Sequence, residues 1–227
     1  MGSSDGMQVV LFDLDGVIAD TAKYHFLAWK HLSEKIGVTI DEEFNEQLKG
    51  ISRMESLERI LELGQKSDQY SLVEKEKMAD DKNELYIELI QTITPEDALP
   101  QIPQVLASLK DKEIKIGLAS ASKNGPLLLD LLGLTEFFDC IVDPTSVVAG
   151  KPAPDIFLKG SELLGVQPSQ CVGIEDASAG VWAIKDAGMT AIAIGDVINL
   201  AHADKVLSST CELTSNVITQ VWHENHK

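Results

Sequence analysis

The sequence has 227 residues, of which 44% are hydrophobic, enough for one sizeable core and a smaller second lobe. Nineteen basic against 36 acidic residues give a formal net charge of −17, which repels nucleic acids and anionic membrane surfaces. No apolar run approaches the roughly 20 residues of a membrane-spanning helix, and the N-terminus lacks the apolar core of a signal peptide. We therefore expect a folded protein that binds neither nucleic acid nor membrane.

The cysteines and the surface pattern bear on location and assembly. Cys140, Cys171 and Cys211 are odd in number and lack the paired spacing of a disulfide framework or a zinc site. This favours a reducing, cytoplasmic location. No surface pattern indicates a strong dimer contact, so we expect a monomer.

The first predicted element is an apolar strand at 9–12 that ends in Asp13-Leu14-Asp15-Gly16. In an open parallel sheet, ligands bind beyond the carboxyl ends of the strands, where both carboxylates would be accessible. Gly16 allows the backbone to leave the strand in a conformation that other residues resist. A strand followed by a simple Asp-Gly turn is the alternative interpretation of this motif.

An all-helical insert is predicted next, because residues 20–96 show helical periodicity and many charges but no convincing strand pattern. Short hinges at 16–21 and 94–100 would join this insert to the rest of the chain. Gly37, Gly50, Gly64 and Pro95 mark the expected helix ends. The predicted helices span 22–36, 41–48, 54–63 and 72–93.

From residue 102 onward, strands and helices alternate, which predicts βαβ units and a Rossmann-like, doubly wound parallel sheet with helices on both faces. Residues 1–19 and 97–227 would form this α/β core, and 20–96 the helical cap. The predicted strands are 114–120, 140–142, 171–175 and 190–194, with helices at 127–132, 155–164 and 177–187. A short strand near 206–210 and a last helix would complete the fold.

Three further motifs follow or flank the predicted strands. Ser120 follows a strand in Ala119-Ser120-Ala121-Ser122-Lys123-Asn124, where hydroxyls and backbone amides can hold phosphate oxygens, although a helix cap is the commoner use of such residues. Prolines flank Lys151 in Gly150-Lys151-Pro152-Ala153-Pro154-Asp155, which by itself is also consistent with a surface turn.

The last motif, Glu175-Asp176, places two adjacent acids at the end of an apolar strand. Such acids repel each other when buried unless a cation lies between them. With Asp13 and the main-chain carbonyl of Asp15 they offer an oxygen-rich site suited to Mg²⁺. No cluster of His or Cys residues indicates a softer metal.

Together, Asp13-Leu14-Asp15-Gly16, Ser120, Lys151-Pro152 and Glu175-Asp176 resemble the four motifs of the haloacid dehalogenase superfamily of phosphotransferases. Longer runs at 13–25, 50–53, 120–124 and 151–155 extend the resemblance, over nearly the whole chain, to the hexose-phosphate mutases of that superfamily. The activity so implied is a Mg²⁺-dependent conversion of β-glucose 1-phosphate to glucose 6-phosphate through a sugar bisphosphate.

The resemblance also implies roles for the motif residues. Asp13 would be the nucleophile that becomes an aspartyl phosphate, and Asp15 the general acid and base. Ser120 would hold the phosphoryl oxygens and Lys151 would neutralise charge. Asp13, Asp15, Glu175 and Asp176 would form the metal site, with Glu175 binding directly or through water.

The matching substrate-binding positions come from both lobes: Thr21, His25, Trp29, Gly50, Arg53, Ser56 and Lys82, together with Ser120, Ala121, Ser122 and Asn124. Ser52 and Glu55 have the spacing of a capping box, which would put Arg53 at a helix N-terminus that favours an anion. The competing interpretations are a solvated Arg53, a His25 stacked between the lobes and a Lys82 on a solvated helix face. The acidic segment Asp80-Asp81-Lys82-Asn83-Glu84 departs from the more basic one expected there.

Two other functions remain open at this point. A sugar-phosphate phosphatase would use the same four motifs with a cap that admits water to the aspartyl phosphate, and would release inorganic phosphate. A non-catalytic phosphosugar-binding protein would not need Asp13 or Asp15, and both are present.

Overall fold

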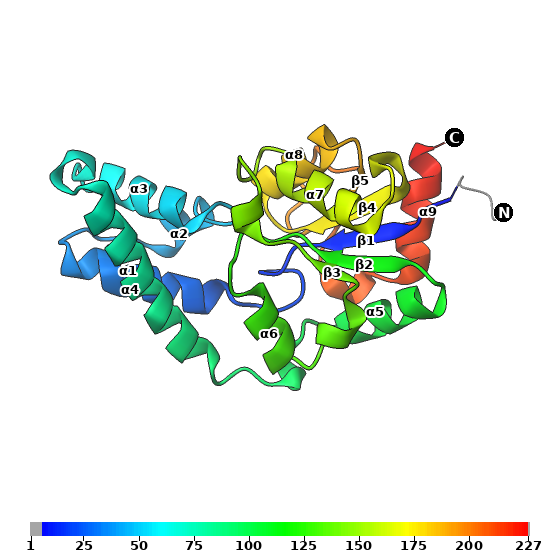
Figure 1. The fold of residues 1–227 in the computed structure, drawn as a ribbon, viewed down its shortest axis with the longest axis horizontal. Helices are drawn as coiled ribbons and strands as arrows, with labels where there is room; N and C mark the ends of the chain where they lie inside the picture. Colours follow the sequence, from blue (N-terminus) through cyan, green and yellow to red (C-terminus); the bar gives the residue numbers. More distant parts are fainter. Residues whose placement is uncertain (1–5, 227) are drawn as a thin grey trace.

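A six-stranded, all-parallel sheet forms the centre of the computed structural model, which describes residues 6–226 (Figure 1). Its strand order is β3-β2-β1-β4-β5-β6. The chain builds outward from β1 on one side and then returns to add β4 on the other, so the topological switch point lies between β1 and β4. The strands are β1 (Val9–Phe12), β2 (Lys115–Leu118), β3 (Cys140–Ile141), β4 (Cys171–Glu175), β5 (Thr190–Ile194) and β6 (Lys205–Leu207).

Helices cover both faces of this sheet, as the doubly wound prediction requires (Figure 1). Successive residues of β1 face opposite ways: Val10 and Phe12 belong to one apolar cluster, Val9 and Leu11 to another. The first cluster lies under α5 (Ile102–Asp111), α6 (Gly125–Leu131) and α9 (Ser215–Asn225), and the second under α7 (Asp155–Leu164) and α8 (Ser178–Asp186).

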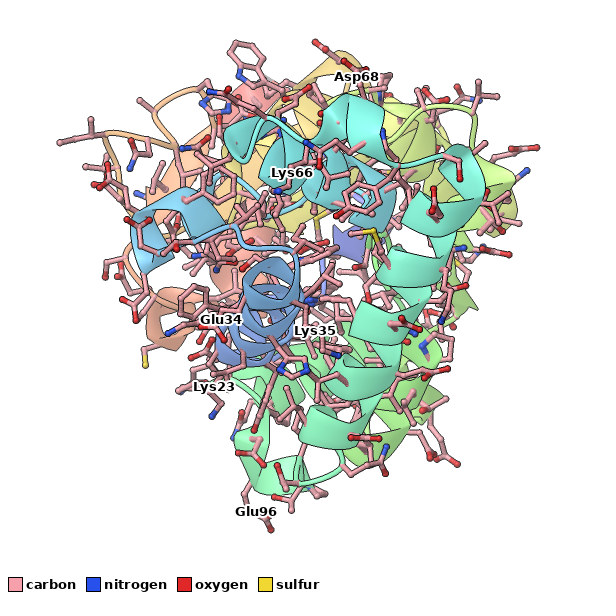
Figure 2. All side chains as sticks on the ribbon, turned by 90° about the vertical axis from the view of Figure 1, so that its left-hand side faces the viewer. Lys23, Glu34, Lys35, Lys66, Asp68 and Glu96 are labelled. Carbon is pink, nitrogen blue, oxygen red and sulfur yellow. The ribbon has the colours of Figure 1, made fainter. Side chains whose placement is uncertain are left out.

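The predicted helical insert forms a separate lobe of α1 (Ala22–Lys35), α2 (Glu42–Glu46), α3 (Arg53–Leu63) and α4 (Leu72–Ile90). Figure 2 looks at this lobe from its outer end and shows α1 beside the long α4, with charged side chains such as Lys35 and Asp68 on the outside. Leu57, Ile60 and Leu61 are fully buried in an apolar cluster of the lobe's own. A capping box of Ser71 and Glu74 begins α4.

The element boundaries shift by a few residues from those predicted. The strand expected at 114–120 is Lys115–Leu118, the helix at 72–93 ends at Ile90, and the strand near 206–210 is Lys205–Leu207. The helix at 41–48 is only Glu42–Glu46. Helix α5 has no counterpart among the predicted elements. Over residues 6–226, no helix combines the length and apolarity needed to cross a bilayer.

The two predicted hinges lie side by side. Ala19 pairs with Ala98 in an antiparallel bridge, and the Leu99 amide donates to the Ile18 carbonyl at 2.8 Å. These hydrogen bonds hold together the two segments of the chain that lead into and out of the helical lobe. The domain limits 1–19, 20–96 and 97–227 stay a prediction, and residues 1–5 and 227 lie outside the described part of the chain.

We predict that Gly173→Ala destabilises the fold by about 1–3 kcal/mol, because a Cβ on this β4 residue would lie 2.5–2.8 Å from side-chain atoms of Ile184 on α8. Urea denaturation measures the change. Gly6→Ala is the control, because a Cβ there has nothing within 4 Å. Equal midpoints for wild type and Gly173→Ala would contradict the packing argument.

Candidate active site

The parallel register brings the predicted motifs to one edge of the sheet. Phe12 is level with Leu118 of β2 and Ile174 of β4, so the residues that follow these three strands meet at their carboxyl ends. The Asp13 amide donates to the Ile174 carbonyl at 2.9 Å, which extends the ladder one residue past β1. Strand pairing therefore places Asp13 beside Glu175.

Gly16 makes the turn after β1 possible. Its φ is +79°, and a Cβ built on it would lie 2.1 Å from Oδ2 of Asp176. Only a glycine lets this backbone turn approach the Asp176 carboxylate so closely. The conformational role expected for Gly16 is confirmed, and the contact also ties the first motif to the last.

Lys151 is completely buried between two carboxylates. Its Nζ donates to Oδ1 of Asp13 at 2.7 Å and to Oε1 of Glu175 at 2.6 Å. Burial by itself would lower the pKa of Lys151, but the two carboxylates outweigh it and raise that pKa above its usual value. Lys151 is thus a fixed cation behind Asp13 rather than the solvated residue of a surface turn.

Glu175 is held at both carboxylate oxygens. While Oε1 accepts from Lys151, Oε2 accepts from the backbone amides of Asp176 and Ala177 at 2.7 and 2.8 Å. A Cβ on Gly180 would lie 1.9 Å from Oε1, so the first turn of α8 leaves room for this side chain only because residue 180 is a glycine. Glu175 therefore orients Lys151.

The acidic cluster fits a divalent cation. Asp13, Glu175 and Asp176 each bring a carboxylate oxygen within 4.8 Å of the others. Burial, with the charge of Glu175, raises the pKa of Asp13 to about 7 even though Lys151 opposes it. Burial and the charges of Glu175 and Asp13 raise the pKa of Asp176 well above its usual value. A bound cation would relieve this repulsion.

Asp15 is in a different environment from Asp13. Its Oδ1 accepts from the Thr21 hydroxyl and lies 3.3 Å from Nε2 of His25. Burial raises the pKa of Asp15, but His25 and Thr21 outweigh it and hold that pKa below its usual value. The Asp15 carboxylate lies outside the three-residue acidic cluster, so the expectation that Asp15 binds the metal now rests on its main-chain carbonyl.

His25 connects Asp15 to Lys82. The Nζ of Lys82 is 2.9 Å from Nδ1 of His25, whose ring stacks on Tyr86 at 4.1 Å between centroids. Burial and the charge of Lys82 lower the pKa of His25. Because the Lys82 ammonium group can only donate, Nδ1 of a neutral ring accepts from it, and the proton on Nε2 faces Asp15. His25 therefore stacks on an aromatic ring and contacts the Asp15 carboxylate at the same time.

Lys82 is buried, with 4% of its surface exposed, and does not lie on a solvated helix face. Its ammonium group lies over the rings of Trp29 and Tyr86, 4.6 and 4.9 Å from their centroids. Burial, together with the charge of Arg53, lowers the pKa of Lys82 to about 7. The acidic residues around it in the sequence do not determine its surroundings, because the helix turns Lys82 inward.

A cavity of about 460 Å³ lies between the two lobes and collects most of the predicted site residues. Thr21, Lys151 and Glu175 are not among its lining residues: they are buried behind Asp15 and Asp13 and act through those side chains. The predicted residues that line the cavity are Asp13, Asp15, His25, Trp29, Gly50, Arg53, Ser56, Lys82, Ser120, Ala121, Ser122, Asn124 and Asp176.

Several lining residues take part in local structure. Ser120 Oγ accepts from the Ser122 amide at 3.1 Å, which leaves its hydroxyl hydrogen to be donated to a ligand. The Ser56 hydroxyl donates to the Ser52 carbonyl at 3.0 Å. Gly50 has a φ of +74°, and a Cβ on it would lie 3.0 Å from that of Ala177, so it allows the cap to approach the core.

The capping box expected at the start of α3 forms only in part. The Ser52 hydroxyl accepts from the Glu55 amide at 3.2 Å, but the Glu55 carboxylate pairs with Arg59 at 2.9 Å. The nearby Arg59 guanidinium is a stronger partner for a carboxylate than a backbone amide. Arg53 is nevertheless the first residue of α3, at the helix N-terminus as predicted.

The cap residues that line the cavity but were missed by the sequence analysis include Lys49, Glu76, Asp80 and Asn83. The Asn124 side-chain amide donates to Oδ1 of Asn83 at 2.9 Å and so joins core to cap. The run Asp80-Asp81-Lys82-Asn83 drew attention to two of these residues, but only the docking of α4 shows which side chains of the run turn inward.

Comparisons with known proteins agree with this geometry. The family model for haloacid dehalogenase-like hydrolases matches residues 7–188. The chain belongs to the haloacid dehalogenase-like family. The resemblance inferred from the four motifs is thereby confirmed.

Relatives of known name narrow the similarity within the family. The chain is 49% identical over 218 residues to a β-phosphoglucomutase of Bacillus subtilis, covering 96% of each chain. It superposes on the crystal structure of a β-phosphoglucomutase from Clostridium difficile with a TM-score of 0.95 and 48% identity, covering 97% of this chain and 99% of that one. A phosphorylated-carbohydrate phosphatase of Thermotoga maritima is 30% identical over 222 residues, covering 95% and 100%.

We predict that Gly180→Ala lowers turnover at least tenfold, because its Cβ would displace Glu175 and leave Lys151 with one carboxylate partner. Steady-state kinetics with a hexose phosphate substrate measure the loss. Ser178→Ala, an exposed position on the same helix, is the control. Unchanged turnover in Gly180→Ala would contradict the positioning role of Glu175.

Proposed function

We propose that this chain isomerises β-glucose 1-phosphate to glucose 6-phosphate through an aspartyl phosphate and a sugar bisphosphate. The observation that carries the proposal is that Asp13 and Asp15 of the core and Arg53 and Lys82 of the cap line the same cavity. A bisphosphate needs two anion positions, one at the nucleophile and one at a distance from it. The cavity offers both.

A phosphatase of the same family is the second candidate, because a relative at 30% identity carries that name. The mutases at 48% and 49% identity are much more similar to this chain over the same extent. The cap also favours transfer to a sugar: His25 and Asn83 from the cap contact Asp15 and Asn124 of the core. Contacts of this kind complete the site and exclude water from it.

In the first half-reaction, the Asp15 carboxylate accepts the proton of the sugar 6-hydroxyl as that oxygen attacks the phosphorus of the aspartyl phosphate. The bond between phosphorus and Asp13 breaks, and its electron pair returns to the carboxylate. The low pKa of Asp15 suits this role, because the residue starts as an ionised base. Lys151, 2.7 Å from Asp13, neutralises the carboxylate as it leaves.

In the second half-reaction, the bisphosphate presents its C1 phosphate to Asp13. The carboxylate attacks phosphorus, the bond to the C1 oxygen breaks, and the protonated Asp15 gives its proton to that oxygen. The Ser120 hydroxyl donates a hydrogen bond to the transferring phosphoryl group. Arg53, at the N-terminus of α3, and Lys82 bind the phosphate that is not transferred.

We assign the metal as Mg²⁺, which neutralises charge on the transferring phosphoryl oxygens when bound. Asp13, Asp176 and the Asp15 carbonyl would hold it. Glu175 fits a contact through water better than direct binding, because Lys151 and two backbone amides occupy its oxygens.

We further propose a monomer in the cytoplasm that acts on small sugar phosphates. All three cysteines lie among the described residues and none of them is in a disulfide, which suits a reducing compartment. The net charge of −17 argues against nucleic acid as a partner.

The test is an assay with Mg²⁺, β-glucose 1-phosphate and a trace of glucose 1,6-bisphosphate, following glucose 6-phosphate and free phosphate in parallel. We expect glucose 6-phosphate to form with little free phosphate. Free phosphate as the main product would establish the phosphatase instead, and the absence of both products would overturn both candidates.

Asp13→Asn should lower turnover by at least about a thousandfold, because an amide is a poor nucleophile and cannot form the aspartyl phosphate. Mass spectrometry after incubation with the bisphosphate should show one added phosphate on wild type and none on the variant. Turnover by Asp13→Asn at the wild-type rate would refute the covalent mechanism.

Magnesium at about 100 times its dissociation constant should stabilise the wild type by about 2.7 kcal/mol, or roughly 5–10 °C in Tm. Asp176→Asn should lose this shift and melt higher than wild type without metal, because a repelling carboxylate is gone. Asp130→Asn, at an exposed position on α6, is the control. Differential scanning calorimetry with Mg²⁺ or with EDTA measures the shift in Tm. A shift in Asp176→Asn equal to that of the wild type would contradict the assignment of Asp176 as a metal ligand.

A further inference from the structure

An acidic residue of the cap faces the cation proposed to bind the distal phosphate. Arg53 and Asp80 both line the cavity, from α3 and α4. The Nη1 atom of Arg53 lies 3.4 Å from Oδ1 of Asp80. The Arg53 side chain is 22% exposed and that of Asp80 is 76% exposed, so the pair lies at the mouth of the cavity with Asp80 outermost.

The charges around this pair make Asp80 significant. Arg53 and Lys82 are close enough that the charge of Arg53 contributes to the low pKa of Lys82, after burial. In the part of the chain that the structure describes, Asp80 is the acid in ion-pair contact with Arg53. Glu76, one turn earlier on α4, also lines the cavity. Acidic side chains of α4 therefore partly neutralise the positive charge of Arg53 and Lys82 at this end of the cavity.

We propose that Asp80 is a binding-site residue that competes with the non-transferred phosphate of the substrate for Arg53 and weakens the hold on that phosphate. A guanidinium paired with a carboxylate must give up that contact to bind a phosphate in bidentate fashion. A phosphate bound to Arg53 also lies near the Asp80 charge and is repelled by it.

This inference rests on the proposed function, because it assigns the distal phosphate to Arg53. In that reaction the bisphosphate must present each of its phosphates to Asp13 in turn. A distal site that holds either phosphate too tightly would slow the exchange of the two ends. A competing carboxylate at 3.4 Å limits the affinity of Arg53 for the phosphate.

The chain offers a matched control in the next residue. Asp81 pairs with Lys77 on the same helix, at 3.0 and 3.3 Å, and does not line the cavity. Asp80→Asn and Asp81→Asn change the net charge equally and are nearly isosteric. Their long-range effects on an anionic ligand are therefore similar, and a difference between them reports the local contact with Arg53.

Isothermal titration with glucose 6-phosphate, in the presence of Mg²⁺, is the first measurement. We expect Asp80→Asn to bind about three- to fivefold more tightly than wild type, the range of a partly exposed ion pair, and Asp81→Asn to bind like wild type. In the assay, the KM for β-glucose 1-phosphate should fall by a similar factor in Asp80→Asn alone, without a rise in kcat.

A double-mutant cycle with Arg53→Gln isolates the pair. In the Arg53→Gln background, Asp80→Asn should have a clearly smaller effect on binding, because the competition for Arg53 is gone and only the repulsion between the Asp80 charge and the phosphate remains. Equal effects of Asp80→Asn with and without Arg53, or equal effects of Asp80→Asn and Asp81→Asn, would overturn the inference.

The binding measurements also separate this inference from the proposed function. If the wild type binds glucose 6-phosphate but does not form it, the mutase function is wrong, and the double-mutant cycle still tests the role of Asp80. Full mutase activity with no difference between the two Asn variants would overturn only the role of Asp80. No binding by wild type would overturn both.

Discussion

The buried ammonium of Lys151 is the contact on which the geometry of this site depends. It lies between Asp13 at 2.7 Å and Glu175 at 2.6 Å, with none of its surface exposed. Removing one partner of such a buried group leaves an uncompensated charge that costs about 3–5 kcal/mol. The strand register, the backbone amides that hold Glu175 and the glycine at 180 all serve to keep these three groups together.

The charge left over after this pairing gives the site its affinity for cations. Lys151 balances one of the two carboxylates that it contacts, and Asp176 adds another close by. In a protein of net charge −17, such a site would repel a sugar phosphate. A divalent cation on the core side, and Arg53 and Lys82 on the cap side, would give the proposed sugar bisphosphate favourable contacts at both ends of the cavity.

The sheet and its motifs could be predicted from the sequence because the information is local. Apolar runs that end in Asp13, Ser120 and Glu175 indicate parallel strands, and parallel strands bring their carboxyl ends together. Helix α5 was not predicted, although its buried residues Val105, Leu106 and Leu109 follow a helical spacing. The cap residues that reach the cavity were harder to predict. Lys82 and Asp80 are two positions apart, yet Lys82 is buried and Asp80 is exposed.

That difference comes from packing between elements, which no local pattern encodes. Lys82 is buried because Trp29 of α1 and Tyr86 of its own helix form an aromatic surface for its ammonium, and because His25 accepts its hydrogen bond. His25 in turn donates to Asp15, which is the group proposed to move the proton. The docking of α4 on α1 therefore contributes to the lowered pKa of Asp15, a residue that belongs to the core. Since the cap holds Lys82 and His25 but the core holds Asp15, the acid–base properties of Asp15 depend on the position of the cap.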